Sequence, residues 1–215
     1  MEKMDEFFAA RAEGYDEHML NEVEGCREAY SKIAELIPEN TQTLLDLGCG
    51  TGLELEGIFR RFPELKVTGI DLTAEMLAKL SEKFPDKNIT LINGDYFQTD
   101  LGKEKFNTAI SFETMHHFSH EMKTGLYGKI CDSLKSDGVY IECDYMVETQ
   151  EEEEHWFSEN SRIRKEMGIP ENEFYHYDTP CTIKNQIKML ISAGFKRAEA
   201  VFQKGNTVII TAKKD

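Results

Sequence analysis

The sequence lacks the paired cysteines that mark a disulfide framework or a zinc site. Its five cysteines are scattered, odd in number and without a CxxC spacing, which argues against both. No apolar run approaches the roughly 20 residues that span a bilayer. The N-terminus has no apolar signal region and carries too many acids for a transit peptide. We therefore expect reduced thiols and, by default, a cytoplasmic protein.

Basic residues are also in short supply. The 25 lysines and arginines face 40 acidic residues, which gives a formal net charge of -15. The densest basic stretches, residues 60–61 and 162–165, are short, so the general field of the protein repels a phosphate backbone. We expect a small-molecule substrate as the partner, and neither nucleic acid nor a membrane. The sequence gives no indication of the oligomeric state.

The 215 residues suit one α/β domain with a sizeable core. After residue 40, apolar segments typical of strands alternate with helical segments, and this order indicates a parallel sheet with crossover helices. The expected strands are residues 43–47, 66–71, 88–95, 106–113 and 138–146. The expected helices between and after them are residues 52–62, 73–84, 120–138 and 183–195.

Three segments do not belong to this alternation. Residues 1–40 are expected to form a helical cap, with one helix over 4–19 and another over 22–36. Residues 149–180 form an insert that begins with a Glu-rich helix over 149–168 and contains several aromatics, and we expect it to cover the acceptor as a lid. A closing hairpin that turns at Gly205 and Asn206 is not part of a simple nucleotide-binding fold.

The stretch LLDLGCGTG, residues 44–52, places three glycines at every second position after a buried strand. Such a loop lets backbone amides and a helix N-terminus approach a ligand. The dinucleotide fingerprint is G-x-G-x-x-G, but Leu53 stands where its third glycine would be. A nicotinamide-dependent oxidoreductase is therefore the weaker alternative, and the sequence also has no Tyr-x-x-x-Lys pair.

Four motifs together resemble those of class I S-adenosylmethionine-dependent methyltransferases. LLDLGCGTG is similar to the first motif of that family, GIDLTAEML to the second, NGDYF to the third and SFETMHHF to the fourth. The resemblance implies an α/β, Rossmann-like fold: a seven-stranded mixed sheet of order 3-2-1-4-5-7-6, strand 7 antiparallel, with helices on both faces. It also implies an enzyme that uses S-adenosylmethionine to methylate an acceptor.

In this family three acids at neighbouring strand ends surround the cofactor. The resemblance assigns Asp46 to its ammonium side and Asp95 to its adenine amino group. Asp71 ends the second strand some twenty residues after the loop, where a carboxylate can accept both ribose hydroxyls. Asp46 and Asp95 also suit turns, and Cys49 suits the loop by size alone. The other expected cofactor residues are Tyr15, Gly48, Cys49, Gly50, Leu72, Met76, Tyr96 with its neighbour Phe97, and Phe112.

The fourth strand ends where, by the resemblance, the methyl group lies. Glu113, His116 and His117 are therefore the catalytic candidates, although a base is needed only if the acceptor is protonated and the histidines also suit capping and packing. Asp144 and Tyr145 rank below them. The segments EEEEHW and FYHYDTPC contain ligand-type residues, and Glu151 and His155 stand at an i, i+4 spacing. No metal is expected, because consecutive glutamates usually form a solvated surface.

The acceptor and the atom that is methylated stay open at this stage. One alternative is an adenosylmethionine-binding protein that transfers no methyl group, such as the family relative that makes carboxy-S-adenosylmethionine. No pair of arginines can be assigned to that extra carboxylate.

Overall fold

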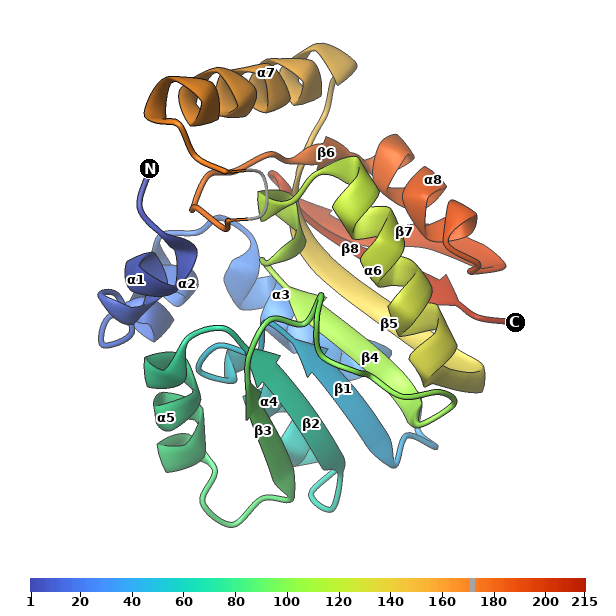
Figure 1. The fold of residues 1–215 in the computed structure, drawn as a ribbon. Helices are drawn as coiled ribbons and strands as arrows, with labels where there is room; N and C mark the ends of the chain where they lie inside the picture. Colours follow the sequence, from blue (N-terminus) through green and yellow to red (C-terminus); the bar gives the residue numbers. More distant parts are fainter. Residues whose placement is uncertain (171–172) are drawn as a thin grey trace.

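The computed structural model describes residues 1–170 and 173–215, and its centre is a twisted sheet with helices on both faces (Figure 1). The strand order is β3-β2-β1-β4-β5-β8-β7. Strands β1 to β5 pair in parallel, and β8 is antiparallel to β5 and β7. The predicted order is confirmed, apart from the extra two-residue strand β6, which pairs with β5. The strands are β1 Thr43–Leu47, β2 Lys66–Asp71, β3 Ile89–Asn93, β4 Phe106–Phe112, β5 Leu134–Val147, β6 Cys181–Thr182, β7 Arg197–Lys204 and β8 Thr207–Lys213.

Two apolar clusters hold helices against the two faces of the sheet. On β1, Leu44 packs into the cluster that contains Ile58 of the helix behind the glycine loop, and the adjacent Leu45 packs into the cluster that contains Tyr127 on the other side. A strand covered on both faces has a continuous apolar run, which explains the sequence TLLDL. Helices α3 to α5 share one cluster, and α6 and α8 share the other. The helices are α1 Met4–Ala9, α2 Tyr15–Asn21, α3 Cys26–Leu36, α4 Leu53–Arg61, α5 Ala74–Lys83, the 3₁₀ turn η1 Met115–His117, α6 His120–Ser133, α7 Gln150–Met167 and α8 Ile183–Ser192.

The helical cap is divided differently from the prediction. The expected helix over 4–19 is two helices separated by a turn that ends at Gly14, a residue with low helix propensity. The next helix begins at Cys26 instead of residue 22, because Gly25 has φ +86 and a Cβ there would lie 2.7 Å from the carbonyl oxygen of Lys204. Glycine alone fits such a conformation without strain.

The helix expected to continue to Gly138 ends at Ser133, and β5 begins at Leu134. Leu134 is fully buried and pairs with Phe106 of β4, after which the register of the two strands shifts. Gly138 lies at this irregularity, where a Cβ would come within 2.8 Å of the Leu134 Cβ. The glycine therefore serves a strand bulge and does not cap a helix.

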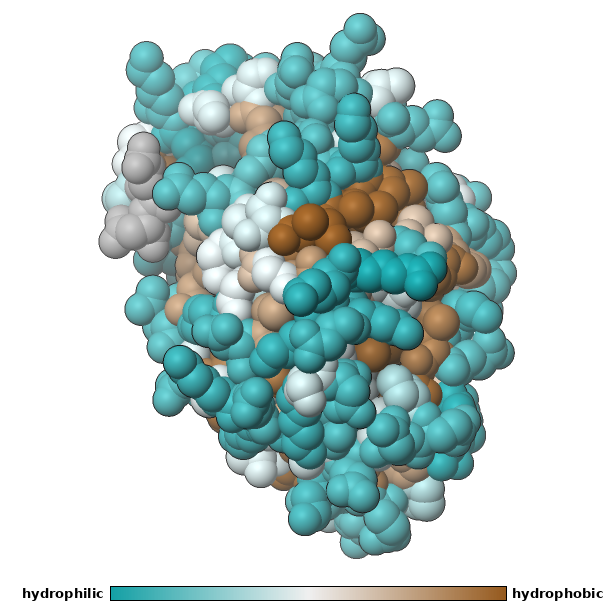
Figure 2. All heavy atoms as spheres, turned by 90° about the vertical axis from the view of Figure 1, so that its right-hand side faces the viewer, coloured by the Kyte–Doolittle hydropathy of each residue, from teal (hydrophilic) through white to brown (hydrophobic). Residues whose placement is uncertain are grey.

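The N-terminal helices and the insert both lie near the carboxyl ends of the parallel strands (Figure 1). Helix α7 lies apart from the sheet at the top of that view, and Glu153 is its buried residue. The side carrying α6, α8 and the C-terminal hairpin is largely hydrophilic, with an apolar strip across its middle (Figure 2). Among the described residues, no helix combines the length and apolar character needed to cross a bilayer.

Candidate active site

The glycine loop connects β1 to α4 with three residues in the left-handed region, Gly48 at φ +69, Gly50 at +46 and Gly52 at +73. A Cβ on Gly48 would lie 2.7 Å from the Thr114 hydroxyl oxygen. A Cβ on Gly50 would meet only the Tyr15 ring, at 3.9 Å. The loop thus needs glycine for its conformation, and at Gly50 its backbone borders open space.

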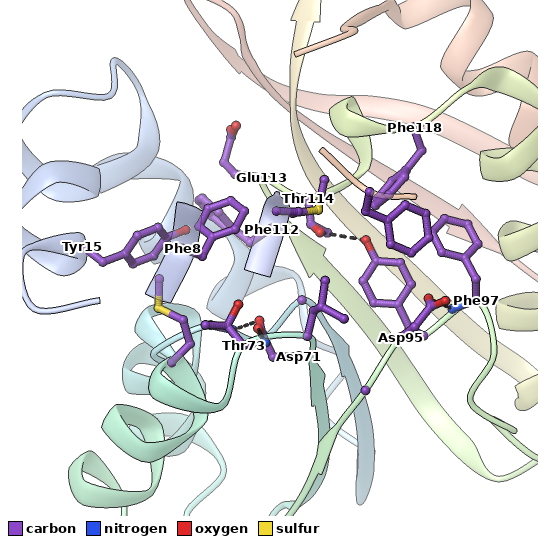
Figure 3. Close-up of a pocket in the computed structure, with 18 residues that line it drawn as sticks. Phe8, Tyr15, Asp71, Thr73, Asp95, Phe97, Phe112, Glu113, Thr114 and Phe118 are labelled. Carbon is purple, nitrogen blue, oxygen red and sulfur yellow. Dashed lines mark hydrogen bonds between the residues drawn. The ribbon is translucent and has the colours of Figure 1, made fainter. Parts of the chain in front are cut away.

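Asp71 fixes this loop to the end of β2. Its Oδ2 accepts a hydrogen bond from the Gly50 amide at 2.8 Å, and its Oδ1 accepts one from the Thr73 amide at 2.8 Å. Burial raises the pKa of Asp71, and the hydrogen bonds from Thr73 and Gly50 partly oppose that rise. Figure 3 shows the carboxylate and Thr73 at the edge of a cavity.

This first cavity lies between the glycine loop, the ends of β2 to β4 and the N-terminal helices. Tyr15 and Phe8 lie on one side of it, and Phe97 and Phe118 lie on the other, as Figure 3 shows. Ten of the twelve residues expected at the cofactor line it: Tyr15, Gly48, Gly50, Asp71, Leu72, Met76, Asp95, Tyr96, Phe97 and Phe112. The sequence reasoning missed Met4, Phe8, Thr73, Thr114, Phe118 and Phe174, which also line it.

Asp46 and Cys49 do not line the cavity. Cys49 is 1% exposed and packs on β2, where a Cβ on Gly69 would lie 2.8 Å from its Sγ. This contact supports the alternative that Cys49 is chosen for its size. Asp46 is fully buried, and neither of its carboxylate oxygens has a hydrogen-bond partner. Their roles toward the cofactor stay predictions.

Glu54, in the first turn of α4, is a second buried acid that the sequence reasoning missed. It is 5% exposed and its Oε1 has no hydrogen-bond partner. Burial raises the pKa of Glu54 to about 7. Burial and the neighbouring Glu54 carboxylate raise the pKa of Asp46 well above its usual value. A surface helix beginning GLELEG gives no sign that this particular glutamate faces inward.

Asp95 both shapes a turn and lines the first cavity, which are the two roles that its place in the sequence left open. Its Oδ1 accepts a hydrogen bond from the Phe97 amide at 2.7 Å, which shapes the turn after β3. The same residue lines the first cavity beside Tyr96, whose hydroxyl is 2.9 Å from the Thr114 hydroxyl. The turn after β3 therefore forms part of the cavity wall.

Glu113 lies at the boundary between the first cavity and a second one and lines both. Its φ of +49 is strained for a residue with a side chain, and its amide donates to the Cys143 carbonyl of β5 at 2.8 Å. Burial raises the pKa of Glu113 to about 8, against the opposing charge of His116. A carboxyl group with this pKa exchanges its proton near neutral pH.

The histidines after Glu113 face the second cavity. His116 Nδ1 is 2.7 Å from Asp144 Oδ1, so the two form a hydrogen bond in the interior. Burial lowers the pKa of His116, but the Asp144 carboxylate outweighs it and the result is about 9. Burial and the charge of His116 lower the pKa of His117. Tyr145 also lines this cavity.

The second cavity also contains two residues of the insert, His176 and Asp178. The amide and hydroxyl of Thr179 donate to the His116 carbonyl at 2.6 and 2.9 Å, and these bonds attach the insert to η1, the turn that follows β4. The sequence FYHYDTPC contains ligand-type residues but no recognisable spacing. Only the folded chain brings them beside the histidine pair, some sixty residues away in sequence.

With this geometry in view, the chain can be compared with known proteins. Residues 44–138 match the family described as methyltransferase domain. The chain is 28% identical over 182 residues to the carboxy-S-adenosyl-L-methionine synthase of Nautilia profundicola, covering 80% of this chain and 76% of that protein. It is 32% identical over 96 residues to the malonyl-[acyl-carrier protein] O-methyltransferase of Acetivibrio thermocellus, covering 45% and 33%. Residues 44–138 belong to the methyltransferase domain family, and the similarity to S-adenosylmethionine-dependent enzymes extends over most of the chain.

The structure of human N-acetylserotonin methyltransferase in complex with S-adenosylmethionine shares the fold of this methyltransferase. The TM-score is 0.69 at 16% sequence identity, and the match covers 98% of this chain and 56% of that one. The chain therefore spans about three quarters of the first relative, a third of the second and just over half of this structure.

The cofactor of this methyltransferase family is S-adenosylmethionine, and the residues present fit it. When bound, it supplies an electrophilic methyl group on a cationic sulfur. Two buried acids with unpartnered carboxylate oxygens, Asp46 and Glu54, flank the glycine loop in sequence and do not line the cavity. Asp71 and Asp95 line the cavity itself. Of the described residues that line the first cavity, none is a lysine or arginine that would suit a pyrophosphate instead.

Proposed function

We propose that this enzyme transfers the methyl group of S-adenosylmethionine to a small polar molecule that binds in the second cavity. The observation that carries the proposal is the position of Glu113, whose side chain borders both cavities. A methyl group that moves from the cofactor in the first cavity to an acceptor in the second must cross this boundary. The second cavity has a volume of about 980 Å³, which is within the range of small-molecule sites.

Methyl transfer mainly requires that the protein orient the reactants and exclude water. Phe8 and Tyr15 cover the first cavity from the N-terminal helices. Glu113 is our candidate for removing a proton from a hydroxyl or amine acceptor, because a base with a pKa near the working pH is the most effective. Its pKa of about 8 meets that condition. His116 and His117 contact the same space and orient the acceptor.

A small acceptor is favoured over nucleic acid by charge. The net charge of -15 opposes a phosphate backbone. Glu22, Glu24, Glu113 and Asp178 all line the second cavity, so they would oppose an anionic polymer there as well. A neutral or cationic small molecule meets no such opposition.

Carboxy-S-adenosylmethionine synthesis is the second candidate, because the relatives that match most of the chain have that name. A carboxylate beside the sulfonium carbon would call for cationic side chains. Of the described residues lining the two cavities, Arg11 is the one lysine or arginine. It stacks on the Phe7 ring and pairs with Glu2 at the surface. The other cationic group of the second cavity, His116, is already hydrogen-bonded to Asp144. This arrangement favours methyl transfer.

Mass spectrometry of the reaction tests both candidates at once. The enzyme is incubated with S-adenosylmethionine and a panel of small phenols, amines and carboxylic acids, including acids that lose carbon dioxide readily and can supply the carboxyl group that the second candidate needs. Our proposal expects adenosylhomocysteine together with a methylated panel member, and carboxylated adenosylmethionine as the product would favour the second candidate. Glu113→Gln should lower kcat at least tenfold and leave adenosylhomocysteine affinity within about threefold, while Glu121→Gln, an exposed acid on α6, should change neither.

A further inference from the structure

Three imidazole nitrogens surround one oxygen of Asp178 in the second cavity. Asp178 Oδ1 is 3.4 Å from His117 Nδ1, 3.6 Å from His116 Nε2 and 3.8 Å from His176 Nε2. None of these contacts is a hydrogen bond. Asp178 Oδ1 and His117 Nδ1 are both buried without any partner, and the His117 side chain is only 3% exposed. Unpaired polar atoms in the interior are costly, so the arrangement calls for a further group.

The spacing of these atoms suits a metal ion better than a proton. The ligand atoms of His116, His117 and Asp178 all lie within 4.8 Å of one another. Zinc binds nitrogen and oxygen at about 2.0 to 2.2 Å in tetrahedral sites, so two of its ligands lie roughly 3.3 to 3.6 Å apart. A shared proton would bring its two partners to roughly 2.7 to 3.2 Å. The observed separations of 3.4 and 3.6 Å are those of neighbouring ligands.

The hydrogen bond between His116 and Asp144 provides a second, independent observation. Metal-binding histidines almost always donate their other ring N–H to a carboxylate or carbonyl, which fixes the tautomer. Here Nδ1 of His116 is 2.7 Å from Asp144, which is 1% exposed. With the hydrogen on Nδ1, loss of the second proton of the imidazolium leaves the lone pair of Nε2 facing Asp178, and an ion bound there takes the place of that proton. The tautomer that this bond selects is the one that a metal ion requires.

A second cluster of ligand-type residues in the same protein shows the opposite pattern. His120, Glu153 and Cys181 also lie close enough to share an ion. However, His120 Nε2 is 2.9 Å from Glu153, Asn185 donates to the same carboxylate, and Lys123 lies 3.1 Å from the Cys181 sulfur. Every member of that cluster already has a partner, so it needs no ion.

We propose that His116, His117 and Asp178 bind one divalent transition-metal ion at the wall of the second cavity. Two histidines and one carboxylate form a ligand set that zinc, iron and related ions accept. His176 lines the same cavity and is the nearest further donor to Asp178. No metal was expected from the sequence, in which Asp178 stands some sixty residues after the histidine pair.

Three protein ligands leave coordination positions free, as in catalytic metal sites. The described residues place these positions beside the second cavity, so an oxygen or nitrogen atom of the acceptor can complete the shell. Coordination would orient the acceptor and favour its deprotonated form. This last step rests on the proposed methyl transfer, whereas binding of the ion does not.

The test is a titration of the full-length protein with Co²⁺ and with Zn²⁺ after treatment with a chelator. Calorimetry should give one site, and bound Co²⁺ should give a visible absorption spectrum of low coordination number. His117→Ala and Asp178→Asn should each weaken binding at least 100-fold, and Asp144→Asn should weaken it about 10- to 100-fold. His155→Ala, an exposed histidine on α7, is the control and should bind as the wild type does.

Circular dichroism and adenosylhomocysteine binding of the same samples show that the variants are folded. Either of two results overturns the proposal: no site of unit stoichiometry for Co²⁺ or Zn²⁺, or equal affinity in the wild type and folded Asp178→Asn. Because the titration needs no acceptor, its failure is separate from a failure of methyl transfer. A protein that binds the ion and methylates nothing would contradict the proposed function alone.

Discussion

Asp71→Asn should weaken adenosylhomocysteine binding by about 1.5 to 3 kcal/mol, because hydrogen bonds to charged groups contribute about that much. The wild-type carboxylate accepts from Gly50 and from Thr73, each at 2.8 Å. Asparagine keeps the size of the side chain but has one oxygen instead of two. It must therefore release either the glycine loop or the start of α5, and it offers the ribose a weaker acceptor.

At about 1.4 kcal/mol for each tenfold change, that loss is roughly a 10- to 150-fold rise in Kd. Calorimetry at pH 7.5 measures it, with adenosylhomocysteine as the titrant and NAD as a second ligand that should not bind. Asp100→Asn is the matched control, because its Oδ1 also accepts a backbone amide, from Gly102 at 2.9 Å, on the exposed loop after β3. It should lose stability only slightly and keep its affinity.

The reasoning is refuted if folded Asp71→Asn binds adenosylhomocysteine within twofold of the wild type. It is also refuted if the wild type binds NAD and not adenosylhomocysteine, because the glycine loop would then serve another ligand. Equal losses in Asp71→Asn and Asp100→Asn would show that the effect is one of general stability.

Three further outcomes are expected. Burial raises the pKa of Glu54 to about 7, so between about pH 4.5 and 7 the folded protein retains a proton that the unfolded chain has lost, and the free energy of unfolding falls as pH rises through that window. Denaturant titrations should therefore show a smaller decline for Glu54→Gln than for the wild type. Equal declines would contradict the assignment. Gly48→Ala should abolish measurable adenosylhomocysteine binding, because residue 48 has a φ of +69 and the added methyl would lie 2.7 Å from the Thr114 hydroxyl. Unchanged binding would show that the loop can rearrange freely. In hydrogen exchange followed by mass spectrometry, amides of α7 should exchange with solvent faster than those of α6, since α7 has a single buried residue and α6 has six. Equal protection of the two helices would show that α7 is held by contacts beyond those described.

The sheet and most of the first cavity could be predicted because their signals are local. A buried apolar run followed by glycines identifies a strand end and its loop within ten residues, as in residues 43–52. Asp71 and Asp95 end neighbouring parallel strands, so their proximity follows from the strand order. Each of these inferences requires only the pattern of one segment and the topology.

The features that the sequence did not reveal depend on contacts between distant segments. Glu54 resembles a surface acid until α4 is placed against the sheet. Asp178 reaches His117 only because Thr179 of the insert bonds to η1, the turn that follows β4. Gly138 has the pattern of a helix cap, and only the pairing of Leu134 with Phe106 shows that it serves a bulge.

The contact between the N-terminal segment and the insert links the walls of the two cavities. Lys3 and Tyr175 form an antiparallel bridge, flanked by hydrogen bonds from Met4 to Phe174 and from His176 to Glu2. Met4 and Phe174 line the first cavity, while His176 lines the second. One small ribbon thus belongs to the walls of both compartments, and displacing it opens them together. A ligand that orders or displaces this ribbon in one cavity should therefore change the affinity of the other cavity for its own ligand.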